Sequence, residues 1–242
     1  MPRALSAIPP SLMERRDYHY IEEDFNYDID ANEWVATTGS GDGGSATVGD
    51  EVGGVMTLLT NAQDNTEEYL ESPNETFKFA ANKPLRFRAR IQFAEASTNK
   101  ANVLVGIMDA VAADTLVNDG AGPKSSYSGA CFFKQDGETL WSVEASISTT
   151  QTTAQLTAAN ALDKRARTAG SSSYQWLGID FYPIGTASAE IVFSIDEVPV
   201  YKMVGDFITN ATEMQVAFGV KAGAAAANET LKIDYVSCIQ KR

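Results

Sequence analysis

Apolar and polar residues alternate without a break from Leu85 to Phe93, in the run Leu-Arg-Phe-Arg-Ala-Arg-Ile-Gln-Phe. Successive side chains of a β-strand point to opposite faces, so a period of two is typical of a strand with one buried face. We therefore predict a strand over residues 85–94 whose apolar face meets a core. Its other face carries Arg86, Arg88 and Arg90, spaced about 7 Å apart.

Similar strand-like patterns recur along most of the chain. They lie at about 55–60, 66–71, 76–80, 102–109, 127–134, 138–147, 175–181, 189–195, 198–204, 214–220 and 231–239. Asp136-Gly137 and Asp196-Glu197 are predicted as tight hairpin turns. Residues 39–54 and 110–126 are predicted as loops, and the polar segment 148–173 as holding one short helix at 157–167, where alanines favour helix. Many strands with almost no helix predict an all-β protein, a two-sheet antiparallel β-sandwich or a barrel.

The chain has 242 residues, enough for one large β domain or two small ones, and shows no composition break after residue 25. We predict an extended arm at 1–20 followed by a β-sandwich domain at 21–242. Three prolines discourage regular structure in the arm, and three arginines against Glu14 give the segment up to Arg16 a net charge of +2. Two interpretations stay open: a frayed terminus, or an arm that docks on a neighbouring subunit through Arg3, Leu5, Ile8, Arg15 and Arg16.

The arginine row must be neutralised, because the whole chain carries a net charge of −13. One interpretation pairs Arg86, Arg88 and Arg90 with acidic residues of adjacent strands on the same sheet face. The alternative is an interface that meets an acidic patch of a partner. Residues 17–33, with seven acids and no Lys or Arg, would supply such a patch from a neighbouring copy.

Charge and composition exclude several classes of function. A sequence pI near 4.5 argues against nucleic acid as a direct partner, and no apolar run is long enough to cross a membrane. Cys131 and Cys238 lie in strand-like runs and are predicted as buried free thiols. His19 is the only histidine, so nucleophilic catalysis of the Ser-His-Asp kind would have to use it, and no nucleophile-elbow motif is present. We expect a surface or interface histidine.

Neither a cofactor nor a metal is predicted. Residues 39–44 formally match a dinucleotide motif, but no helix follows to hold a pyrophosphate. Asp28, Asp30 and Asn32 copy the start of a calcium loop, yet the glycine and glutamate that such a loop needs further on are missing. A looser cation site formed with a remote loop stays open.

Glycosidases need two carboxylates facing each other across a cleft. The familiar pattern Glu-x-Asp-x-x-Glu along one strand is absent here. Glu67, Glu68 and Glu71 match it in composition but not in spacing. We therefore predict no catalytic residue and expect the protein not to be an enzyme.

Five segments together carry a resemblance to a known group of proteins. They are Gly-Gly-Val-Met-Thr-Leu-Leu-Thr at 53–60, the run at 85–93, Phe-Ser-Ile-Asp-Glu-Val-Pro-Val at 193–200, Val-Ala-Phe-Gly-Val-Lys-Ala-Gly at 216–223 and Thr-Leu-Lys-Ile-Asp-Tyr-Val at 230–236. This order resembles the concanavalin-like and laminin-G-like jelly rolls of tailed-phage structural proteins, including capsid decoration (cement) proteins. The resemblance implies a non-enzymatic virion protein, made in the host cytoplasm and placed on the capsid surface. Its implied partners are the major capsid protein and copies of itself, with a trimer favoured.

Two other functions stay open for the same fold. A carbohydrate-binding, lectin-like module of a phage structural protein would need an exposed aromatic platform, for which Trp34, Trp141 and Trp176 are the candidates. Trp141 and Trp176 lie in strand patterns and are predicted to be core residues. A glycan-degrading enzyme of the concanavalin-like fold is the second alternative.

Overall fold

The computed structural model describes residues 17–27, 33–39, 43–96, 98–170, 173–225 and 228–242. These residues form strands joined by turns and loops, with one short 3₁₀ turn, η3 (Asn118–Gly120). The strands are β1 (Tyr18–Glu23), β2 (Val35–Thr38), β3 (Ser45–Gly49), β4 (Val55–Leu59), β5 (Glu67–Glu71), β6 (Phe77–Lys78), β7 (Leu85–Ala94), β8 (Ala101–Met108), β9 (Gly129–Lys134), β10 (Ser142–Ile147), β11 (Thr150–Gln155), β12 (Gln175–Pro183), β13 (Ser188–Ile195), β14 (Val198–Asp206), β15 (Glu213–Ala222) and β16 (Thr230–Lys241).

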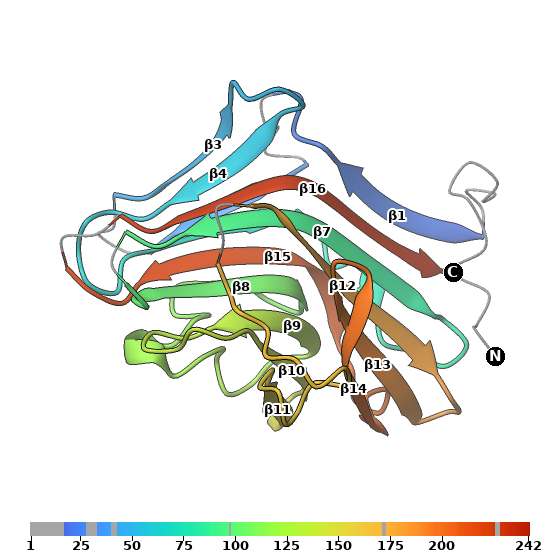
Figure 1. Cartoon of the computed structure of the whole chain (residues 1–242). Helices are drawn as coiled ribbons and strands as arrows, with labels where there is room; N and C mark the ends of the chain where they lie inside the picture. Colours follow the sequence, from blue (N-terminus) through green and yellow to red (C-terminus); the bar gives the residue numbers. More distant parts are fainter. Residues whose placement is uncertain (1–16, 28–32, 40–42, 97, 171–172, 226–227) are drawn as a thin grey trace.

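The strands form two antiparallel sheets that pack face to face. The first sheet has the order β14-β13-β12-β7-β16-β4-β3, with β1 also paired to β16. The second has the order β11-β10-β9-β8-β15-β5-β2, with β6 also paired to β15. Figure 1 shows the first sheet lying above the second along most of its width. The predicted all-β, two-sheet antiparallel sandwich is confirmed.

Strand β7 lies near the middle of the first sheet, between β12 and β16. Its burial alternates as the sequence predicts: the apolar residues are buried and the arginines are half-buried. Phe87 reaches across to Phe218 of β15, with ring centroids 6.4 Å apart. The core between the sheets is therefore continuous under the arginine row.

The predicted turn at Asp196-Glu197 is confirmed and joins β13 to β14. Both residues have positive φ, 51° and 66°, as a type I′ hairpin turn requires. The carboxylate of Asp196 accepts the backbone N–H of Trp176 at 3.0 Å, and the N–H of Asp196 donates to the carbonyl of Trp176 at 2.8 Å. These two bonds fasten the turn to the start of β12.

Several sequence predictions are corrected. Residues 18–20, predicted as part of the arm, belong to β1 and pair with β16, while residues 1–16 lie outside the described residues. The short strands β3 and β11 fall in stretches predicted as a loop and as a polar segment, and β2 falls where no element was predicted. Strand β10 begins at Ser142 rather than at 138. The predicted helix at 157–167 is wrong. Its backbone instead bonds to neighbouring segments, because Arg167 N–H donates to Leu156 and Leu162 N–H to Val200, so tertiary pairing overrides the helix propensity of the alanines.

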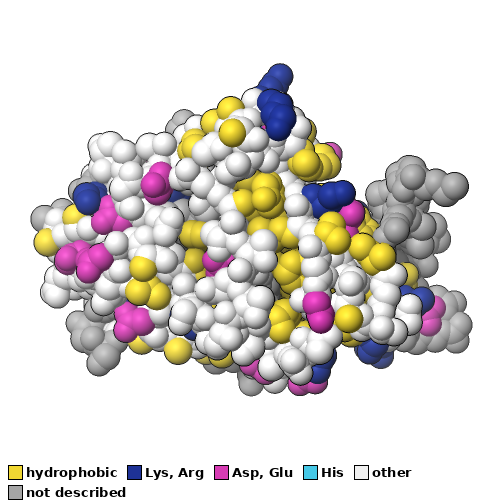
Figure 2. Space-filling model, turned by 90° about the horizontal axis from the view of Figure 1, so that it is seen from below, with side chains coloured by type: hydrophobic (Ala, Val, Ile, Leu, Met, Phe, Trp, Pro, Cys, Tyr) yellow, Lys and Arg dark blue, Asp and Glu magenta, His cyan; other side chains and the backbone are white. Residues whose placement is uncertain are grey.

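The outer face of the second sheet is buried beneath the loop at 109–128. Tyr69, Leu104, Cys131 and Phe133 point to this side and are at most 2% exposed, in a second apolar cluster with Tyr127 of the loop. Seen from below, apolar side chains gather in the middle of the molecule and most charged ones lie toward its margins (Figure 2). No helix within the described ranges is long and apolar enough to span a membrane.

Candidate functional site: an aromatic–arginine surface

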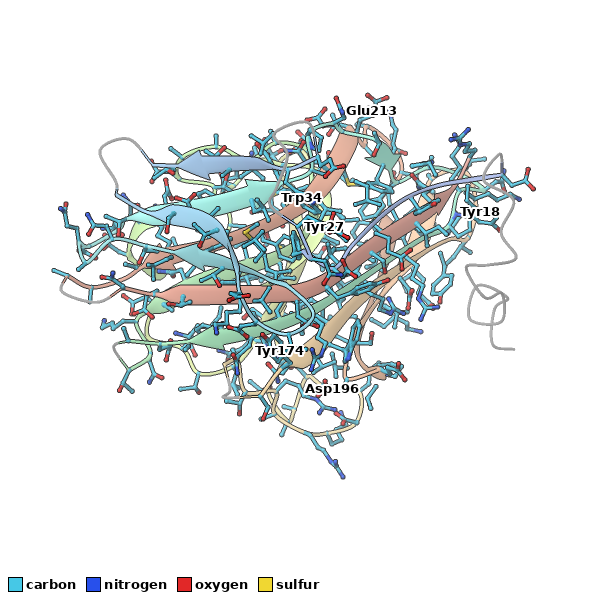
Figure 3. The ribbon with its side chains drawn as sticks, turned by 90° about the horizontal axis from the view of Figure 1, so that it is seen from above. Tyr18, Tyr27, Trp34, Tyr174, Asp196 and Glu213 are labelled. Atoms are coloured by element: carbon cyan, nitrogen blue, oxygen red, sulfur yellow. The ribbon has the colours of Figure 1, made fainter. Side chains whose placement is uncertain are left out.

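The outer face of the first sheet remains open and carries the arginine row. We call this region the aromatic–arginine surface and define it by residues of β7, the start of β12, and β16: Arg86, Arg88, Arg90, Tyr174, Trp176 and Tyr235. Figure 3 looks onto this side of the molecule and marks Tyr174 and Asp196 at the end where β12 begins.

Strand register brings the aromatic side chains to the arginines. Arg90 is opposite Trp176 on β12 and opposite Tyr235 on β16. The two rings meet over the strand between them, with centroids 5.6 Å apart in an edge-on arrangement. A register shift in β16 between Ile233 and Tyr235 places both Asp234 and Tyr235 beside Arg90.

Each arginine of the row is paired within the chain. Asp180 lies 2.7 Å from Arg88 and 3.8 Å from Arg86, and Asp234 lies 2.6 Å from Arg90. Arg90 also sits 4.3 Å from the centroid of the Tyr174 ring, a cation–π contact. The pairing of the row with acids of adjacent strands is thus what the structure shows for one chain. A partner contact through these arginines stays a prediction, and Arg3, Leu5, Ile8, Arg15 and Arg16 lie outside the described residues.

The three tryptophans have different environments. Trp141 is fully buried, as predicted, and Trp34 is 2% exposed. Trp176, predicted as core, is 37% exposed instead. It shares the outer face of β12 with Asp180, while Leu177, Ile179 and Phe181 fill the core. Trp176 is therefore the tryptophan available to a ligand.

A small pocket of about 90 Å³ opens beside Trp176. Its lining includes Arg86, Arg88, Gly178, Ser194 and Glu197. A Cβ atom on Gly178 would collide with the hydroxyl of Ser194 and lie 2.9 Å from a guanidinium nitrogen of Arg88. Glycine at this position is what lets those two polar groups approach the floor of the pocket.

The phenols of this surface, those of Tyr174 and Tyr235, have raised pKa values. Burial, with a smaller effect of the hydrogen bond that Tyr235 donates to Glu22 at 2.7 Å, raises the pKa of Tyr235 to about 12. Burial and the negative charges of Glu51 and Asp234 raise the pKa of Tyr174. The surface offers apolar ring faces, guanidinium donors and carboxylate acceptors, which suits recognition of a polar ligand with an apolar face.

A second, larger hollow lies along β1, with a volume of about 690 Å³. His19, Tyr20 and Arg242 contribute to its lining together with Glu22, Glu23 and Glu33. His19 stacks on Phe77 with ring centroids 5.0 Å apart, and burial lowers its pKa. The hollow thus has three carboxylates against one arginine, close to Asp17, where the described chain begins.

The acidic hollow makes the arm prediction testable. If the arm binds a neighbouring copy, removing residues 1–16 should shift the protein to a smaller oligomer and leave its unfolding temperature unchanged. Sedimentation velocity at low and high salt measures this, with Arg15→Glu/Arg16→Glu as a variant that keeps the length of the arm. An unchanged sedimentation coefficient in both variants would refute the arm as an assembly element.

The acids that came nearest to a glycosidase pattern serve other contacts. Glu67 is 3% exposed and binds Lys221 at 2.9 Å and the hydroxyl of Tyr69 at 2.7 Å. Glu68 accepts the hydroxyl of Thr38 at 2.7 Å. Glu71 is half-buried, and burial raises its pKa to about 6. The possible calcium ligands Asp28, Asp30 and Asn32 lie outside the described residues.

The sequence matches no protein-family model and no curated protein. Solved structures do match its fold over nearly the whole chain. An endo-1,3-β-glucanase from Streptomyces sioyaensis is 15% identical with a TM-score of 0.60, covering 97% of this chain and 98% of that one. The lectin UEA-II in complex with galactose is 10% identical with a TM-score of 0.58, covering 93% and 100%. The carbohydrate recognition domain of Emp46p in its metal-free form is 13% identical with a TM-score of 0.54, covering 89% and 94%.

These likenesses establish the fold class: the chain is a concanavalin-like β-sandwich, the architecture found in both lectins and glucanases. The jelly-roll part of the predicted resemblance is confirmed. The narrower resemblance to capsid decoration proteins stays a prediction, since identities this low show the fold alone.

Sequence reasoning found the arginine row but missed Tyr174, Tyr235, Asp180 and Asp234. The sequence does contain a signal for Asp180. In the alternating run 175–181 it falls on the same strand face as Trp176. No local pattern reveals the shift in β16 that places Asp234 and Tyr235 together at Arg90.

Proposed function

We propose that this chain is a carbohydrate-binding protein and that its ligand binds on the aromatic–arginine surface. The observation that carries this proposal is the exposed Trp176 ring, held edge-on against Tyr235 and bordered by paired guanidinium and carboxylate groups. Sugar rings have apolar C–H faces and hydroxyl edges. An aromatic ring can pack on the face, while charged donors and acceptors bind the hydroxyls.

The structural neighbours support this proposal at the level of fold. Two of them are a carbohydrate recognition domain and a lectin complexed with galactose. The support is by analogy, since one fold serves many functions. A second support comes from this chain itself, in which the outer face of the first sheet is open and that of the second is buried.

We favour binding without catalysis. The carboxylates nearest Trp176 and Tyr235, those of Asp180 and Asp234, are engaged in ion pairs with Arg88 and Arg90. Glycoside hydrolysis uses two carboxylates that face each other across a cleft, whereas these two are bound to arginines on a sheet face. Turnover of any glycan on a broad substrate panel, lost on substitution of an acid of the chain, would instead support the glycan-degrading alternative.

The proposal predicts that Trp176→Ala weakens glycan binding by about tenfold or more, the effect expected when a central aromatic contact is removed. A glycan array would identify ligands, and calorimetry would then give dissociation constants for wild type and variant. Tyr27→Ala is the matched control, because Tyr27 is an aromatic residue 86% exposed and outside the surface. Equal binding by Trp176→Ala and wild type would place the ligand elsewhere, and an array without hits would reject the proposal.

The virion role implied by the resemblance stays a separate prediction. Its test is mass spectrometry of purified phage particles, which should find this protein at a fixed copy number relative to the major capsid protein. Glycan binding and a place on a capsid surface are compatible, so the two experiments answer different questions.

A further inference from the structure

We propose that the small pocket beside Trp176 selects a sugar residue that carries a carboxylate group, such as a uronic or sialic acid. This inference rests on the proposed function, because it assigns a ligand class to the same surface. The pocket lies between Arg86 and Arg88 on one strand and Trp176 and Gly178 on the next. A sugar stacked on Trp176 would therefore place a substituent within reach of the arginines.

One of the two guanidinium groups in the pocket has donors left for an anion. Arg86 and Arg88 share one carboxylate, that of Asp180. Arg88 is tightly bound, since it donates to Asp180 at 2.7 Å and to the carbonyl of Phe87 at 2.6 Å. Arg86 reaches Asp180 only through its Nε atom at 3.8 Å, beyond hydrogen-bond length, and its side chain is 36% exposed. Its guanidinium thus keeps donors for a ligand, and the fork geometry of arginine matches a carboxylate.

The size of the pocket limits what can enter. A volume of about 90 Å³ has room for a carboxylate group. The floor is the backbone of Gly178, and the hydroxyl of Ser194 lies against it. A carboxylate there would meet the Arg86 guanidinium and the Ser194 hydroxyl while its ring stays on Trp176.

Glu197 adds a negative charge to the lining of the pocket. It lies in the type I′ turn next to Asp196 and contributes to the pocket lining. Its negative charge weakens binding of an anion, and the chain as a whole carries −13. The surface therefore suits a single acidic sugar in an otherwise neutral glycan, and a uniform polyanion would be repelled.

The test uses the full chain on an array that carries glucuronate-, galacturonate- and N-acetylneuraminate-terminated glycans, each beside its methyl ester. The ester keeps the sugar ring, removes the negative charge and adds one methyl group. We expect wild type to prefer at least one free acid over its ester by about tenfold. Arg86→Gln should abolish that preference, Arg86→Lys should keep part of it, and Glu197→Gln should increase it. Thermal denaturation of each variant checks that folding is intact.

The outcomes separate this inference from the proposed function. Equal binding of acid and ester by wild type, with both lost in Trp176→Ala, would overturn the acidic-sugar inference and leave carbohydrate binding in place. A preference for the acid that persists in Arg86→Gln would also overturn it, because the carboxylate would then bind elsewhere. Failure of every glycan to bind would refute both.

Discussion

Replacing Lys221 by methionine is expected to lower the free energy of unfolding by about 3–5 kcal/mol, the usual cost of leaving one partner of a buried ion pair without the other. The side chain of Lys221 is 0% exposed. Its ammonium group lies 2.9 Å from Glu67 and 2.8 Å from Asp114, and it donates to the carbonyl of Leu116 at 2.9 Å. Without it, the carboxylate of Glu67 stays buried against an apolar side chain, and the loop at 109–128 loses the two contacts that Asp114 and Leu116 make with Lys221 of β15.

Urea denaturation at pH 7 measures this change, with two controls. In Lys221→Met/Glu67→Gln the buried charge is also removed, so most of the lost stability should return. Lys202→Met removes a lysine that lies 3.4 Å from Glu190 on the surface, and its effect should stay within about 1 kcal/mol. A Lys221→Met variant as stable as wild type would show that the pair is not the attachment we describe.

The buried ion pair also shows where the sequence stops being informative. Lys221 lies in the run Val-Ala-Phe-Gly-Val-Lys-Ala-Gly, which correctly predicts a strand. Its partners Glu67 and Asp114 are 154 and 107 residues away, and no local pattern connects them. By contrast, the alternation of β7 and the turn at Asp196-Glu197 are local features, and both were predicted correctly.

The covered outer face of the second sheet shows another feature that the sequence does not predict. All residues of β8 are buried, although one face of the strand points away from the other sheet. A strand covered on both faces reads as a continuous apolar run, so its sequence predicts burial but not what covers it. Here the cover is the loop at 109–128, which the sequence shows only as an irregular segment. Because this face is covered, the open sheet face is the outer face of the first sheet.

The strand-like run at 175–181 predicts Trp176 to be a core residue. Its position in the alternation indicates an outward side chain instead, because the buried Leu177, Ile179 and Phe181 occupy the other face of the strand. Trp141, assigned to the core on the same kind of evidence, is fully buried. Trp141 thus serves packing and Trp176 is available for binding, and alanine substitution of each should separate the two roles.

Trp141→Ala is expected to lower the free energy of unfolding by about 3–5 kcal/mol, the range for removing a large aromatic side chain from a core. The ring of Trp141 packs edge-on against Phe93 and Phe132, with centroid distances of 6.1 and 6.2 Å. Its indole N–H donates to the side chain of Gln175 at 3.2 Å. The substitution would therefore leave a cavity between the sheets and an acceptor without its donor.

Chemical denaturation of Trp141→Ala, Trp141→Phe and Trp176→Ala tests this assignment. Trp141→Phe keeps most of the packing and loses the indole hydrogen bond, so its effect should be clearly smaller than that of alanine. Trp176→Ala should cost about 1 kcal/mol or less, because its ring is already partly solvated, while it carries the loss of glycan binding. If Trp176→Ala destabilised the protein as much as Trp141→Ala, Trp176 would be a packing residue and its exposure no evidence for a binding surface.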